Sequence, residues 1–442
     1  MSQVNESEED QYIVNESSEI NVGETIGWTD KLLSSLHAFK SRNYTLYFIG
    51  QLISTIGSWL QIVAEGWLIF QLSRSAFYVG LSAAASTLPA LFLSLIGGVI
   101  VDRFPKKKVI MVTQTCSMIL AFILGILTVT NLITVWQIIL LAFLLGIVQA
   151  IDIPARQAYV SELVDDKKLL SSAIALNSTI YNSARVVGPT VAGLLIAGFG
   201  LGMAFLLNGF SYIAVIIALY FIKTKVVPLK VHASPRKAIQ EGLNYAFSHP
   251  TIKTLLMSTV MISIFGWSYS TLMPVIAHDI FNMNASGLGY LYAATGIGAL
   301  FATVMISAYS HKISPYIFII GGNILFAIML IFFTFTRNVY IAYFFLFVIG
   351  FSLVGMFAMI NTTIQHAVSD NMRGRVMSIY TLSYLGFAPI GNFEIGYVAE
   401  KWGPGFAIRI SAFIVLLMGL YFYKNLKQVK KAQMKYDETH LA

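Results

Sequence analysis

The stretch from Gly98 to Lys108 constrains the fold of this chain more than any other. It reads Gly-Val-Ile-Val-Asp-Arg-Phe-Pro-Lys-Lys-Lys and separates two long apolar runs. A helix needs about 20 apolar residues to cross the hydrocarbon core of a bilayer, so each run is long enough to span it. Because short loops rich in Lys and Arg stay on the cytoplasmic side of a membrane, this loop fixes one face. Alternation then places every other loop.

The composition supports a chain that lies mostly in lipid. Of the 442 residues, 57% are hydrophobic and only 11% are charged, whereas soluble domains carry about 25% charged residues. The formal charge of +8 arises from basic residues in short loops between apolar runs. This distribution indicates membrane orientation rather than a nucleic-acid partner. The acidic, polar N-terminus does not read as a cleavable signal peptide.

Twelve apolar runs with regular spacing predict an all-α polytopic membrane protein of two six-helix bundles. The first six spans are expected at about 44–71, 76–101, 109–130, 134–156, 169–198 and 202–222, and the last six at 251–277, 287–310, 316–336, 339–366, 374–399 and 404–423. The expected domains are a disordered acidic tail (1–30), a first bundle (31–222), a basic linker (223–250), a second bundle (251–423) and a C-terminal tail (424–442).

The distribution of cations predicts the orientation. If both termini are cytoplasmic, 24 Lys and Arg residues fall on the cytoplasmic side and 3 on the opposite side. This excess predicts a multi-pass protein of the bacterial inner membrane with the acidic tail, the linker and the C-terminal tail in the cytoplasm.

Two six-span halves joined by a basic linker resemble the major facilitator superfamily. The sequence Gly98-x-x-x-Asp102-Arg103-x-x-Lys106-Lys107 is similar to motif A of that superfamily, with Pro105 where glycine is usual. The run Arg185-Val-Val-Gly188-Pro189-Thr-Val-Ala192-Gly193 resembles its span-5 antiporter motif. The resemblance implies a secondary transporter that works by alternating access.

Further matches resemble the bacterial branch that contains the enterobactin exporter and macrolide efflux pumps. They are Gly50-Gln51-Leu-Ile-Ser54 with Gly57-Ser58-Trp59, Asp152-Ile-Pro154-Ala155-Arg156-Gln157-Ala158, Ala175-Leu176-Asn177-Ser178, and Arg373-Gly374-Arg375-Val376-Met377-Ser378. These motifs specify the family and leave the substrate open.

Span 1 carries a polar seam. Its members are Gln51, Ser54, Ser58, Gln61 and Glu65, and their spacing places all five on one helical face. Lipid disfavours such a face, so it should meet protein or water. In the resembling fold span 1 lines the central cavity, which makes Glu65 a candidate proton-carrying carboxylate. The alternative is a seam that binds neighbouring helices, with Glu65 hydrated at the outer interface.

We interpret the basic loop and the end of span 4 as a cytoplasmic charge latch, which means charged residues that hold the two halves together on the inner side. Asp152 and Arg156 are four residues apart, so they can pair. In the resembling superfamily the motif A aspartate, here Asp102, lies near the N-terminus of span 11, here close to Arg373. The latch set is therefore Gly98, Asp102, Arg103, Asp152, Arg156 and Arg373. The alternative is an orientation signal with exposed ion pairs, each worth less than about 1 kcal/mol.

Other intramembrane polar and small residues complete the candidate set. Arg185 in span 5 should have a partner or face water. Gly188, Pro189 and Gly193 permit close helix packing and a bend, with span 8 as the expected neighbour. Candidates for substrate or proton contact in the second half are Trp267, Asn361, Gln365 and Glu394.

The sequence carries no nucleotide-binding P-loop, no His-Glu-x-x-His pattern and no nucleophile elbow. We therefore expect no enzyme activity, no cofactor and no metal. The hypothesis is a monomeric, proton-coupled exporter of a small amphipathic organic molecule, such as a siderophore, a macrolide or another drug. The alternatives are a lysophospholipid transporter and a membrane receptor or assembly partner that does not transport.

Overall fold

The computed structural model describes residues 36–164, 169–223, 235–309 and 314–440. These residues are almost entirely helical, and no strand occurs among them. The all-α fold class predicted from the sequence is confirmed. The predicted acidic tail, 1–30, lies outside the described residues.

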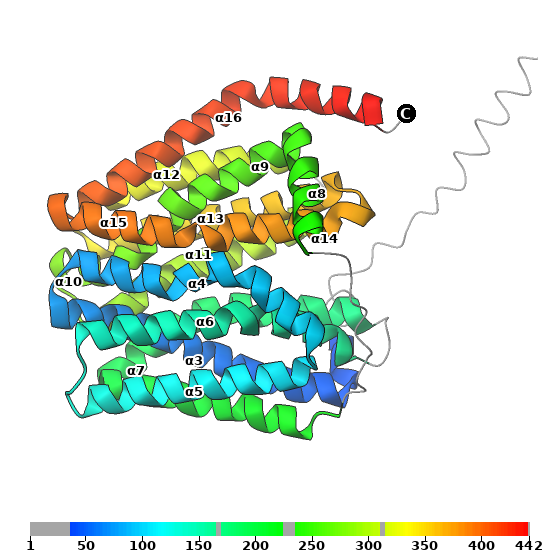
Figure 1. The fold of residues 1–442 in the computed structure, drawn as a ribbon. Helices are drawn as coiled ribbons and strands as arrows, with labels where there is room; N and C mark the ends of the chain where they lie inside the picture. Colours follow the sequence, from blue (N-terminus) through cyan, green and yellow to red (C-terminus); the bar gives the residue numbers. More distant parts are fainter. Residues whose placement is uncertain (1–35, 165–168, 224–234, 310–313, 441–442) are drawn as a thin grey trace, which may run out of the picture.

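The first half of the chain forms one bundle (Figure 1). Its elements are η1 (Leu36–Lys40), α3 (Arg42–Ser73), α4 (Ala76–Arg103), α5 (Lys106–Val129), α6 (Val135–Tyr159), η2 (Val160–Glu162) and α7 (Leu170–Phe221). Local chemistry sets several boundaries, because the side chains of Ser41 and Ser75 accept hydrogen bonds from the first turns of α3 and α4.

Helix α7 contains both span 5 and span 6. Gly200 interrupts it with φ 81°, a conformation that glycine adopts without a Cβ penalty. Near the start of α7, the Ser172 hydroxyl accepts a hydrogen bond from the Ala38 amide at 3.1 Å, and beyond its end the Lys223 carbonyl accepts one from Asn43 at 3.0 Å. Both ends of α7 therefore lie beside the start of α3, as two antiparallel spans require.

The second half forms the other bundle. Its elements are α8 (Pro235–Ser248), α9 (Pro250–Met261), η4 (Ile262–Gly266), η5 (Trp267–Leu272), α10 (Met273–Asp279), α11 (Ala285–Tyr309), η6 (Ile317–Gly321), α12 (Gly322–Phe333), α13 (Val339–Ala367), α14 (Asp370–Thr381), η7 (Leu382–Gly386), α15 (Ala388–Trp402) and α16 (Pro404–His440). The helix α8 lies within the predicted linker and packs on α14, where Glu241 pairs with Arg375 at 2.8 Å.

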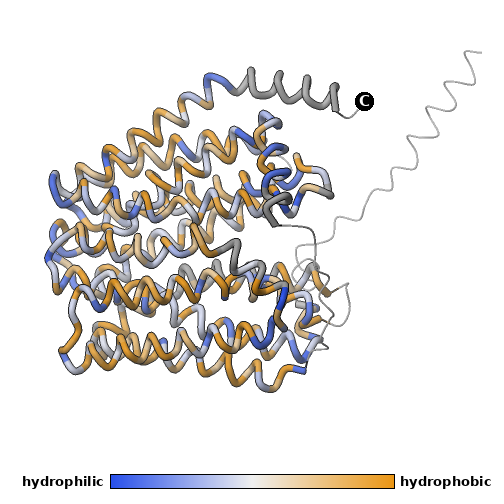
Figure 2. Tube along the Cα trace, viewed as in Figure 1, coloured by the Kyte–Doolittle hydropathy of each residue, from blue (hydrophilic) through white to orange (hydrophobic). Residues whose placement is uncertain are grey.

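The structure is consistent with twelve spans. Within the described residues, nine helices are long and apolar enough to cross a membrane. The other three expected spans are the first part of α7, the pair η6 and α12, and the segment from α14 to α15; all three are helical. Figure 2 shows hydrophobic residues along the middle of the helices and hydrophilic ones gathered toward their ends.

The helix ends define two faces of the molecule. We call the face that carries the α4–α5 connection and α8 the Lys-rich end, and the face with the α3–α4 and α15–α16 turns the Lys-poor end (right and left in Figure 1). The bundles meet along two helix pairs, α4 with α15 and α7 with α11. Helices α4 and α14 share little or no contact in the described chain, so the bundles join mainly away from the Lys-rich end of α4.

Candidate substrate cavity

A cavity of about 410 Å³ lies between the two bundles, and both contribute to its wall. Its lining comes from the middle of the spans rather than from their ends. The volume falls within the range of about 300–1,000 Å³ that is usual for small-molecule sites. This position between two pseudo-equivalent bundles is where a secondary transporter holds its substrate.

The wall contributed by the first bundle is polar. Glu65 of α3 faces the cavity and accepts a hydrogen bond from the Ser82 hydroxyl of α4 at 3.0 Å. One turn away, the Gln61 carbonyl oxygen accepts a hydrogen bond from the amide of Asn208 in α7 at 2.6 Å. The Ser58 and Tyr212 hydroxyls lie 3.5 Å apart on the same wall. Polar side chains of three helices thus form this wall, and Glu65 is the only carboxylate among the described lining residues.

The predicted seam of span 1 divides into two parts in the structure. Ser58, Gln61 and Glu65 line the cavity, as a cavity wall requires. Gln51 and Ser54 are fully buried elsewhere, and the Gln51 amide donates to the Thr55 hydroxyl at 3.2 Å. Toward the Lys-rich end the seam therefore packs within protein, whereas near Glu65 it borders open space.

The wall contributed by the second bundle is aromatic. Trp267 lines the cavity where η4 and η5 replace regular α-helix, and its ring lies 5.6 Å from that of Tyr384 and 6.3 Å from that of Phe357. Tyr269 and Tyr292 also line this side. The cavity can accordingly accommodate a ligand with an apolar or aromatic part and a hydrogen-bonding part.

The remaining candidates of the second half lie away from this cavity. Asn361 accepts a hydrogen bond from the Gln365 amide one turn along α13, and the Gln365 side chain is exposed. Glu394 of α15 is half-buried, and neither it nor the α13 pair is among the lining residues. Their proposed contact with substrate or protons stays a prediction.

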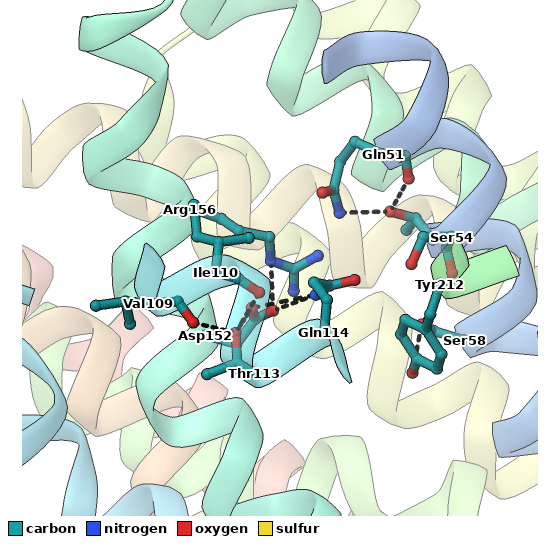
Figure 3. A network of polar contacts seen from close by, with 11 residues as sticks. Gln51, Ser54, Ser58, Val109, Ile110, Thr113, Gln114, Asp152, Arg156 and Tyr212 are labelled. Carbon is teal, nitrogen blue, oxygen red and sulfur yellow. Dashed lines mark hydrogen bonds and ion pairs between the residues drawn. The ribbon is translucent and has the colours of Figure 1, made fainter. Parts of the chain in front are cut away.

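Asp152 and Arg156 form a buried cluster inside the first bundle (Figure 3). The Arg156 Nε lies 2.7 Å from Asp152 Oδ2, and the two residues are 8% and 3% exposed. From α5, the Thr113 hydroxyl donates to Asp152 Oδ1, and the Gln114 amide donates to both carboxylate oxygens at 3.0 and 3.1 Å. These contacts join α5 to α6.

The described residues do not test the rest of the proposed latch. A Cβ added at Gly98 would meet nothing within 4 Å, and Arg103 and Arg373 are exposed. The side chains of Asp102 and Arg185 lie outside the part of the structure that is described. The role of motif A therefore stays a prediction.

Close glycine contacts join the bundles at two places. A Cβ at Gly193 of α7 would lie 2.8 Å from the Cα of Gly289 in α11, so the two backbones touch. Gly188, by contrast, faces Trp59 of its own bundle, and Pro189 lines the cavity. The expected pairing of span 5 with span 8 agrees with these contacts.

The second crossing was not predicted from the sequence. A Cβ at Gly396 of α15 would lie 2.8 Å from the Cα of Gly80 in α4. In each crossing one glycine, Gly80 or Gly289, lies four residues after the first residue of its helix. That first residue is an alanine in both cases, Ala76 of α4 and Ala285 of α11. A search for repeated Ala-x-x-x-Gly pairs at span starts would have found this second contact.

Two bundles around a central, polar-and-aromatic cavity define a membrane transporter of the major facilitator type. Residues 33–441 match the family described as "Transmembrane secretion effector", and the chain belongs to that family. This agrees with the resemblance to the major facilitator superfamily drawn from the motifs.

Similar proteins are transporters, not enzymes. The chain is 26% identical over 406 residues to the staphyloferrin A transporter of Staphylococcus aureus, covering 89% of this chain and 98% of that protein. It is 24% identical over 400 residues to the enterobactin exporter of Salmonella typhimurium, covering 87% and 92%. Both relatives are named for siderophores.

Solved structures share the fold at low sequence identity. A variant of the nucleoside transporter NupG superposes with a TM-score of 0.71 at 12% identity, covering 87% of this chain and 99% of that one. A bacterial homologue of the lysosomal transporter Spinster, in an inward-facing, unoccupied conformation, gives 0.69 at 13% identity, covering 90% and 97%.

Proposed function

We propose that this protein is a proton-coupled exporter of a siderophore-type organic molecule in the bacterial inner membrane. The observation that carries the proposal is the position of Glu65, a carboxylate on the wall of the cavity between the bundles. The names of the two siderophore transporters among its relatives support the substrate class.

Orientation follows from the distribution of charge. We infer that the Lys-rich end faces the cytoplasm, with both termini and the 223–250 linker on that side and the protein acting as a monomer. Because the bundles cross through glycine pairs near the Lys-poor end, the described conformation corresponds to closure on the outer side. Export then requires these crossings to separate while the Lys-rich ends approach each other.

Proton coupling is assigned to Glu65. Its hydrogen-bond partner Ser82 comes from α4, a helix that also crosses to the second bundle at Gly80. A change in the charge of Glu65 therefore acts on a helix that belongs to the interface. An inward proton releases about 2.3 kcal/mol per 100 mV of membrane potential, enough to drive uphill export.

The test uses purified protein in liposomes with an imposed pH gradient, assayed with a citrate-based siderophore, a catecholate siderophore and a macrolide. We expect Glu65→Gln to abolish transport driven by the gradient while substrate exchange without a gradient continues. Glu394→Gln is the matched control, since Glu394 is an intramembrane carboxylate away from the cavity, and it should keep at least half of the activity.

Uphill transport by Glu65→Gln at the wild-type rate would refute the coupling role. Loss of coupling in Glu394→Gln alone would assign the proton to that second carboxylate. Absence of movement for all three substrate classes, with lysophospholipid moved instead, would replace export of siderophores by lipid transport. Ligand binding without movement of any compound would indicate a receptor.

A further inference from the structure

Glu400 of α15 reaches across the bundle interface to the first turn of α4. Its Oε2 accepts a hydrogen bond from the Ser75 hydroxyl at 2.9 Å and another from the Phe77 backbone amide at 3.2 Å. Ser75 is the N-cap of α4, and its own oxygen accepts from the Tyr78 amide at 3.4 Å. The start of a helix in one bundle is therefore capped by a carboxylate of the other.

The register of α15 against α4 explains why Glu400 arrives there. Asn392, Gly396 and Glu400 follow one another at intervals of four, so they share one face of α15. Asn392 donates to the Ala83 carbonyl of α4 at 3.3 Å, and Gly396 packs on Gly80. The antiparallel crossing then brings Glu400 to the N-terminus of α4. A change in the crossing must break this contact.

At the second inter-bundle crossing, no side chain of the other bundle caps the helix start among the residues that the structure describes. The first turn of α11 is capped from its own chain segment, because the Asn284 side chain accepts from the Gly287 amide at 3.1 Å. This cap moves together with α11 and survives any separation from α7. Of the two helix caps, that of α4 depends on the relative position of the bundles and that of α11 does not.

We propose that Glu400 is a gating residue that stabilises closure at the Lys-poor end. Its negative charge lies at the N-terminus of α4, where unpaired amides and the helix dipole favour an anion. When the bundles separate at this end, Ser75 and Phe77 lose that partner to water. The contact therefore favours the closed arrangement over the open one, and it does so independently of the substrate or the coupling ion.

The test measures opening at the Lys-poor end of the full-length protein in liposomes. The native thiol is first removed by Cys116→Ser, and a reporter is introduced by Val79→Cys, because Val79 lines the cavity next to the glycine crossing. A membrane-impermeant maleimide on the Lys-poor side then labels the reporter only when that side opens.

We expect Glu400→Gln to raise the labelling rate about three- to tenfold, the size of a lost helix-terminus charge interaction. Glu400→Ala should raise it at least as much. Lys401→Gln is the matched control, since Lys401 is the next residue of α15 and is exposed. The described contacts of Lys401 are with Tyr397 and Trp402 of the same helix. This variant should leave the rate within twofold.

Spin labels at Leu72→Cys and Tyr397→Cys, two exposed positions at this end on opposite bundles, provide the second measurement. Glu400→Gln should increase the population with the longer distance. Wild-type labelling and distances in both Glu400 variants would overturn the proposal, even if transport were impaired. Failure of siderophore transport with faster labelling would refute the proposed substrate and leave the gating role standing.

Discussion

Replacing Asp152 with asparagine should destabilise the first bundle strongly. The carboxylate accepts hydrogen bonds from Thr113 and Gln114 and forms an ion pair with Arg156. Asparagine keeps the shape but replaces one acceptor oxygen with an NH₂ donor. Whichever way the amide turns, its nitrogen faces a donor about 3 Å away, since both carboxylate oxygens are occupied.

The magnitude follows from burial. Arg156 is 8% exposed, so Asp152→Asn removes the negative charge beside a guanidinium that water hardly reaches. Removing one partner of a buried ion pair costs about 3–5 kcal/mol. For a unit of about 150–250 residues each kcal/mol shifts the melting temperature by about 2–4 °C, so a decrease of roughly 6–20 °C is expected.

The assay is thermal unfolding of the purified protein in detergent, followed by intrinsic tryptophan fluorescence. The double variant Asp152→Asn/Arg156→Met should recover part of the loss, because it removes the buried cation together with the buried anion. A single variant that melts within about 2 °C of wild type would refute the reasoning. A double variant whose loss of stability exceeds the sum of the losses in the two single variants would also refute it.

Three further changes test other parts of the structure. Gly193→Val places side-chain atoms where the Gly289 backbone lies and should lower stability by about 1–3 kcal/mol, measured by the same unfolding assay. Trp267→Ala removes an aromatic wall of the cavity and should weaken substrate binding about three- to tenfold, measured by ligand-induced thermal shift. Asp102→Asn should speed maleimide labelling from the Lys-rich side if motif A latches that side; normal insertion with an unchanged rate would remove the latch.

The spans and their grouping into bundles could be predicted because lipid imposes a simple rule. Every span needs a long apolar run, and every turn needs water, so the length of each run is informative on its own. The chain reversal inside α7 followed from a short break near Gly200. The irregular segment at Trp267 also has a signal in the sequence, since polar and aromatic residues interrupt an apolar run there.

The partners of each polar side chain could not be predicted in this way. Periodicity places Gln51 and Glu65 on one face, but it does not show that Gln51 is buried and that Glu65 borders a cavity. Asn208 and Ser82 belong to other spans, and only the fold brings them to Gln61 and Glu65. The same limit hid the buried pairing of Asp152 with α5 and the crossing at Gly396.

The contact of Glu400 with α4 has a counterpart at the other end of the same interface, where the sequence places Asp102. Glu400 lies near the C-terminal end of α15 and caps the start of α4, whereas Asp102 lies near the C-terminal end of α4. Motif A, by its resemblance, implies that Asp102 caps the start of α14, which leads through η7 into α15. Because these helices are antiparallel, the two caps lie at opposite ends of one interface. Rocking the bundles to form one cap must break the other, so each carboxylate would favour a different state. An interface of this kind needs no single strong bond, since two modest and opposed contacts keep both states accessible.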